Sequence, residues 1–223
     1  MKTKELFFYI LAVLAGGCVP VMSLHPLHNN QTIVFEEKLL GTWTEEPNDK
    51  SIWEFKRNTS KDFSEKTYNL ILCDDKNNKG LFAAHLVKLE DKLFLDVYPT
   101  DLPCDTDDPN KVNWVYNAFF FVPAHTFIKV DAIEPNLAMR ITDDEEMEKL
   151  LKEKPDAVKH QIVEGYDSDI LLTAPTEELQ KFVLEYADDS RVFGDQIVLS
   201  RKKTEDADKS DDTKSQQEPT ETN

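Results

Sequence analysis

The sequence predicts a mainly β fold, an antiparallel β-barrel of about eight strands with two helices before the last strand. Three observations support this prediction. Short segments of alternating apolar and polar residues follow one another from residue 39 onward, with turn residues between them. Helical periodicity appears only after residue 142. Strands and helices do not alternate along the chain, which disfavours a parallel α/β fold.

The strands are recognised by which residues share a face. In the segment 52–57, Trp53 and Phe55 lie on one face, whereas Glu54 and Lys56 lie on the other. Acidic or proline-containing turns separate neighbouring segments at 90–92 and 134–136. The expected strands are 40–44, 52–57, 67–73, 81–89, 93–98, 114–122, 126–133, 137–142, 170–173 and 196–201.

Two helices are expected late in the chain. The segment 143–154 begins with four acidic residues, which are favourable at the positive end of a helix dipole. Its apolar residues Met147, Leu150 and Leu151 share one face. The second helix is expected to begin with Thr173 as its N-cap and Pro175 in its first turn. Its expected buried residues are Leu179, Phe182, Val183 and Tyr186.

Residues 1–17 have the features of a secretory signal peptide, namely a lysine-containing start, an apolar run over 6–15 and two small residues. The run is too short to span a bilayer, which needs ~20 apolar residues. The segment 14–18 resembles the bacterial lipobox. This resemblance implies that the Cys18 thiol carries a diacylglyceryl group, and Val19 after it implies sorting to the outer membrane of a Gram-negative cell envelope. Cleavage without lipidation is the alternative.

The rest of the chain divides into three parts. Residues 18–38 are expected to be a lipidated N-terminus and spacer, with His25 and His28 in contact with solvent. Residues 39–203 form the barrel domain, and residues 204–223 form an acidic tail without large apolar residues, which we expect to be disordered. The formal net charge of −17 disfavours nucleic acid as a partner. The expected partner is the membrane, reached through the lipid, and the oligomeric state is left open.

Gly41, Thr42 and Trp43 open the first barrel strand, and Arg201 lies in the last one. This pattern resembles the lipocalins and related calycin-type barrels, over about residues 39–203. The resemblance implies that the Trp43 indole packs across the closed end of the barrel against Arg201, a favourable cation–π pair. The alternative is a generic antiparallel β domain in which Trp43 is an ordinary core residue.

The resemblance also implies a non-catalytic envelope lipoprotein that binds a small apolar molecule. An eight-stranded barrel has room for side chains or for one small ligand. The alternative is therefore a structural or partner-binding lipoprotein with a solid interior. The aromatic residues expected to line a cavity are Trp53, Phe55, Trp114, Tyr116 and Phe120.

Cysteine and acidic residues offer little further chemistry. Cys73 and Cys104 could form one disulfide in an oxidising compartment, or remain two buried thiols. The acidic stretch 101–108 is the best candidate for a calcium site, but it lacks the spacing of an EF-hand and a solvated loop is favoured. We predict no metal, no cofactor and no catalytic residues.

The histidines form no zinc-binding motif along the sequence. His85 and His125 lie on or beside expected strands, where either could pair with Asp96 or Asp131 across a sheet. A structural role is expected for both.

Overall fold

The computed structural model describes residues 20–47, 49–59, 64–76, 78–100, 122–163 and 169–202. Several sequence predictions lie outside these residues. They concern the signal peptide, the acidic tail, the acidic stretch 101–108, and the residues Cys18, Cys104, Trp114, Tyr116 and Phe120.

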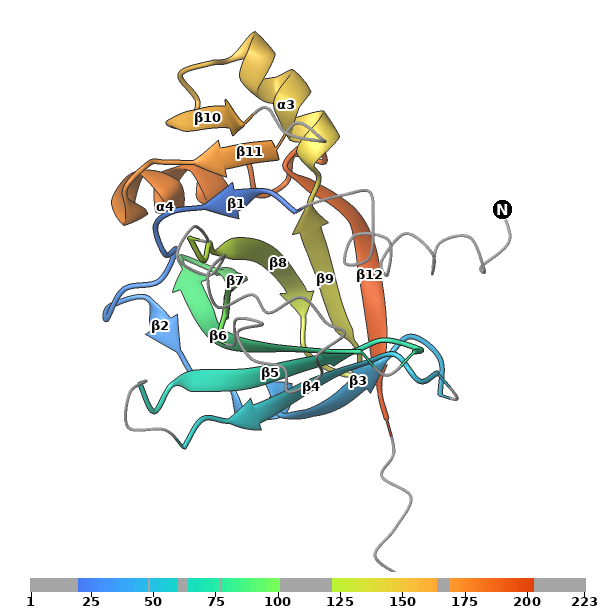
Figure 1. Cartoon of the computed structure of the whole chain (residues 1–223). Helices are drawn as coiled ribbons and strands as arrows, with labels where there is room; N and C mark the ends of the chain where they lie inside the picture. Colours follow the sequence, from blue (N-terminus) through green and yellow to red (C-terminus); the bar gives the residue numbers. More distant parts are fainter. Residues whose placement is uncertain are drawn as a thin grey trace, which may run out of the picture.

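Eight antiparallel strands close a barrel, which confirms the predicted fold class (Figure 1). Each strand pairs with the next around the ring, and the pairing of β6 with β7 completes the closure. In ring order the strands are β3 (Gly41–Thr44), β4 (Ile52–Arg57), β5 (Thr67–Cys73), β6 (Lys79–Leu89), β7 (Lys92–Pro99), β8 (Thr126–Ala132), β9 (Leu137–Thr142) and β12 (Phe193–Arg201).

Both expected helices precede the last strand. Helix α3 (Asp144–Glu153) is capped by Asp143, whose Oδ1 accepts a hydrogen bond from the Glu146 backbone N–H. Helix α4 (Thr176–Glu185) has Pro175 as its N-cap, so the prediction of Thr173 is wrong. The reason is that the Thr173 backbone N–H bonds to the Lys159 carbonyl and continues the preceding strand pairing. Within the described ranges, no helix is both long and apolar enough to cross a membrane.

The N-terminal segment, residues 20–34, packs on the barrel. The prediction of a spacer over 18–38 is therefore wrong for the described residues, which begin at Pro20. Strand β1 (Met22–Ser23) pairs in parallel with β11 (Asp169–Leu172), and β2 (Ile33–Val34) pairs with β6. The physical reason is burial, since the side chains of Val21, Leu27 and Ile33 are almost completely removed from solvent.

Two short elements complete the fold. Strand β10 (His160–Val163) pairs with β11, so β1, β11 and β10 form a small sheet beside α3 and α4 at one end of the barrel (Figure 1). A 3₁₀ helix, η1 (Glu37–Leu39), leads from the N-terminal segment into β3.

Two hydrophobic cores result from this arrangement. The inner core fills the barrel with the inward rows of its strands, including Trp43, Phe55 and Tyr68. The outer core joins the outward row of β6, β7 and β8 to the two helices and to the N-terminal segment. Leu27 and Phe94 belong to it, from the segment and the barrel respectively. The outer core explains why the barrel strands carry apolar residues on both faces.

Candidate functional site

A fully buried carboxylate, Asp96, is the centre of the main polar cluster outside the barrel. It lies on the outward row of β7, between Phe94 and Tyr98. Its side chain is 0% exposed because the N-terminal segment covers it. A buried charge is costly unless hydrogen bonds and partner charges compensate it.

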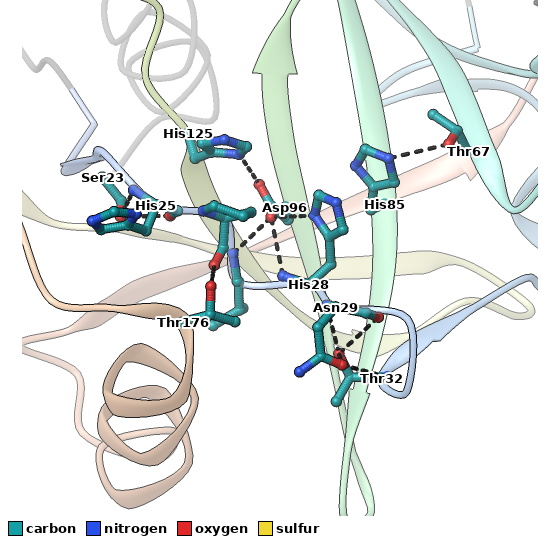
Figure 2. Close-up of polar contacts among 12 residues, drawn as sticks. Ser23, His25, His28, Asn29, Thr32, Thr67, His85, Asp96, His125 and Thr176 are labelled. Carbon is teal, nitrogen blue, oxygen red and sulfur yellow. Dashed lines mark hydrogen bonds and ion pairs between the residues drawn. The ribbon is translucent and has the colours of Figure 1, made fainter. Parts of the chain in front are cut away.

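Four donors satisfy the Asp96 carboxylate, as Figure 2 shows. Its Oδ2 accepts hydrogen bonds from the backbone N–H groups of Leu27 at 2.7 Å and His28 at 3.2 Å. His28 Nδ1 also lies 2.7 Å from Oδ2, and His125 Nδ1 lies 2.7 Å from Oδ1. The carboxylate therefore connects the N-terminal segment to β7 and to the approach to β8.

Burial alone would raise the pKa of Asp96, but the hydrogen bonds from His125 and His28 hold it well below its usual range. The side chain is thus an ionised acceptor without a proton to donate. It follows that the Nδ1 atoms of both histidines carry their hydrogens and donate them. The carboxylate consequently fixes the orientation of both imidazole rings.

A third histidine, His85, extends the cluster across β6. Its ring stacks on that of His28, with the centroids 3.8 Å apart, and its Nε2 lies 3.1 Å from Thr67 Oγ1. Burial and the nearby His28 lower the pKa of His85 to about 4, so this ring is neutral at neutral pH. Its Nδ1 atom is buried, and no partner for it lies among the described residues.

Helix α4 holds the same segment from the other side. Thr176 Oγ1 donates a hydrogen bond to the Pro26 carbonyl at 2.8 Å, and Gln180 Nε2 donates one to the Leu27 carbonyl at 2.8 Å. Residues 26–28 are therefore bound both to the barrel and to α4. We call this set of contacts, centred on Asp96, the histidine–aspartate latch.

The latch has a clear chemical capability, which is to bind one segment tightly. Both oxygens of Asp96 are occupied by donors, and two of those donors are backbone groups. In the part of the chain that the structure describes, no group of three or more His, Cys, Asp and Glu side chains is arranged to hold a metal ion. These contacts support a positioning role for Asp96 and its histidines.

The sequence identified one half of this cluster. Of the pairings that the sequence left open, that of His125 with Asp96 is present, whereas Asp131 pairs with Lys129 and Arg140 and His85 bonds to Thr67. The prediction that His28 faces solvent is wrong, because its ring and backbone both bind Asp96. The sequence does carry a signal for this cluster. In the outward row of β7, Asp96 lies between Phe94 and Tyr98, so burial of this row requires hydrogen-bond partners for Asp96 from another segment.

Gly41, Trp43 and Arg201 meet at the opposite end of the barrel. The Arg201 guanidinium carbon lies 4.2 Å from the centroid of the Trp43 ring, and Trp43 Nε1 donates to the Leu39 carbonyl at 2.9 Å. Arg201 also donates 2.6 Å hydrogen bonds to the carbonyls of Leu40 and Lys38. The Trp43 side chain is 0% exposed.

The predicted cavity-lining residues have different environments. Phe55 is fully buried and packs edge-on against Tyr68, with centroids 6.2 Å apart. It belongs to the filled part of the barrel. Trp53 is half-buried and packs against the same core. Cys73 is half-buried at the end of β5, and its predicted partner Cys104 lies outside the described residues.

Comparison with protein-family models, with curated proteins and with solved structures found no match. The fold assignment therefore rests on the barrel itself.

Proposed function

We propose that this protein is an exported lipoprotein, tethered to the cell envelope through Cys18, whose lipocalin-like barrel binds a small apolar molecule without catalysing a reaction. The observation that carries the proposal is the asymmetry of the barrel. One end is closed by Trp43 beneath Arg201. Near the other end, inward apolar side chains such as those of Leu72 and Phe82 are half-buried, without a pair like Trp43 and Arg201 described over them.

The half-buried side chains share the inward rows of their strands with fully buried residues. Four of them lie toward the end where β5 turns into β6 and where β7 leads to β8. An apolar ligand entering there would remove this surface from water, which favours binding by about 25 cal/mol per Å² buried. The residues toward this end are Leu72, Phe82, Ile141 and Ile197, while Trp53 pairs with Trp43 and other half-buried residues, among them Leu40 and Ile133, lie toward the closed end.

Strand β7 ends and β8 begins at this same end of the barrel. The sequence between Pro99 and Thr126 includes the remaining predicted lining residues Trp114, Tyr116 and Phe120. These residues lie outside the described part of the chain, so their contribution to a ligand site stays a prediction.

The ligand proposal is tested by native mass spectrometry of the soluble chain from Val19 to Asn223, searching for a co-purified small molecule, followed by titration with dodecanoate. Leu72→Arg places a charge among the half-buried inward side chains, and we expect it to weaken binding at least about tenfold. Leu81→Arg is the matched control, because Leu81 lies on the paired strand and is 42% exposed on the outside. Equal dodecanoate binding by both variants would refute the proposal.

A packed barrel is the second candidate, and the inner core favours it. Trp43, Phe55 and Tyr68 are among the largest side chains of the molecule and are fully buried inside the barrel. In this candidate the lipoprotein is a structural or partner-binding module. Absence of a co-purified molecule together with no dodecanoate binding by the unmodified chain would support it.

The anchor is tested separately. Cys18→Ser removes the thiol that would carry the lipid, so we expect the variant to leave the membrane fraction and become soluble in the envelope. Membrane sedimentation of Cys18→Ser to the same extent as the unmodified protein would contradict lipidation at Cys18.

A further inference from the structure

The described fold begins almost at the proposed anchor. Pro20 is the first described residue, and Val21 directly after it is buried in the outer core. Only Val19 separates Pro20 from Cys18. Two residues of extended chain span at most about 7 Å, so a lipid on Cys18 would hold Pro20 within about that distance of the membrane surface.

Exposed apolar side chains gather around this point. Six large apolar side chains are exposed in the described part of the chain. Four of them lie near the small sheet: two on β10, one directly after β1, and one on the segment before β8 that pairs with β1. These four are Leu24, Val122, Ile162 and Val163. The segment of Val122 is included because His125, three residues later, pairs with Ser23 of β1.

The register of the small sheet places these residues close to the chain's entry point. Met22 pairs with Leu171, and Val163 pairs with Asp169 at the other edge of β11. Because β1 and β11 are parallel and β10 is antiparallel to them, Pro20 and Val163 lie at the same end of the sheet. Met22, Leu24, Leu171 and Val163 share the face opposite to the buried residues Val21 and Ile170, together with the exposed Gln161. Ile162 pairs with Ile170 and therefore belongs to the other face.

We propose that this face of the small sheet rests on the lipid bilayer that holds the anchor. This inference rests on the proposed lipidation of Cys18. Because only Val19 lies between Pro20 and the proposed anchor, the membrane is the surface that this face of the sheet meets. The net charge of −17 argues against electrostatic attraction to anionic lipids, whereas apolar side chains favour the boundary between headgroups and acyl chains. The domain is thus held against the membrane in one orientation.

The test compares the accessibility of two introduced thiols in the lipidated full chain, reconstituted in vesicles of neutral and anionic phospholipid. Val163→Cys reports on the proposed membrane face. Val198→Cys is the matched control, because Val198 is also a strand valine, is 45% exposed against 42% for Val163, and lies on β12 of the barrel. A water-soluble maleimide labels each variant, and the parent chain gives the background rate from the native cysteines.

In vesicles we expect the thiol at 163 to react at least about fivefold more slowly than in the same variant made soluble by Cys18→Ser, because the interface excludes the reagent. The thiol at 198 should react equally in both forms. If the lipidated protein floats with the vesicles but both positions react as fast as in solution, the proposed orientation is refuted while the anchor stands. If the chain carries no lipid and does not float, both proposals fail.

Discussion

At the scale of single residues, the closed end of the barrel depends on a glycine. Gly41 has a φ of +123°, which side-chain-bearing residues rarely adopt. A Cβ atom at this position would lie 2.5 Å from Arg201 Nη1. Gly41 therefore leaves the space in which the guanidinium lies over Trp43. The spacing Gly-x-Trp and the distant arginine are parts of one packing arrangement.

We expect Trp43→Ala to lower the free energy of unfolding by about 3–5 kcal/mol, because it removes a large, fully buried aromatic ring and the partner of Arg201. Urea denaturation measures the change. Trp43→Phe, which keeps most of the buried surface, should cost clearly less. An unchanged unfolding midpoint for Trp43→Ala would contradict the closing role of this residue.

Asp96→Asn should lower the free energy of unfolding by about 3 kcal/mol, since it removes the charge on which two imidazoles and two backbone groups converge. It should also speed chymotrypsin cleavage after Leu24 and Leu27. Asp131→Asn is the control, because Asp131 is partly exposed and its ion pairs contribute little. Equal effects of the two substitutions would show that the latch does not hold the segment.

At the scale of elements, the long and strongly patterned segments could be predicted from the sequence. Strands β4, β5 and β9 have the expected bounds, and α3 lies one residue inside its expected range at each end. Strands β1 and β2 have only two residues each, too few for alternation to show. Their formation depends on partners far away in the sequence, and so does the position of His28. For this reason the latch could not be predicted, although Asp96 was one of the two partners expected for His125.

The N-terminal segment contributes to stability as an element of the fold. Leu27 is 0% exposed in the outer core, between the barrel and α4. We expect Leu27→Ala to lower the free energy of unfolding by about 2–4 kcal/mol, because it leaves a cavity there. Leu24→Ala, at an exposed position three residues earlier, should change it by less than about 0.5 kcal/mol. Equal stability of the two variants in urea would mean that the segment does not pack as described.

At the scale of the whole molecule, the buried cluster makes stability depend on pH. The pKa of His85 is about 4 in the folded protein, below its ordinary value of 6.5. Between these values the unfolded chain binds the proton more readily, so folded stability is full above pH 6.5 and falls as the pH drops toward 4. The lowered pKa of Asp96 adds a further loss below its ordinary value of 3.8.

Unfolding in urea at several pH values measures this dependence. His85→Gln should flatten the curve between the folded and unfolded pKa values of His85, because the titrating group is gone. If the free energy of unfolding of His85→Gln changes with pH as steeply as that of the unmodified protein, groups other than His85 cause the pH dependence.

The parallel pairing of β1 with β11 also has a consequence for the order of assembly. Met22 pairs with Leu171, so a loop of about 150 residues must close before this contact forms. Contacts of such high sequence separation form slowly and cannot form before the C-terminal part of the chain has been synthesised. Strand β1 therefore remains unpaired with β11 while most of the chain is being made. The lipidation and cleavage that we propose at Cys18 would have that interval in which to occur, before β1 pairs with β11.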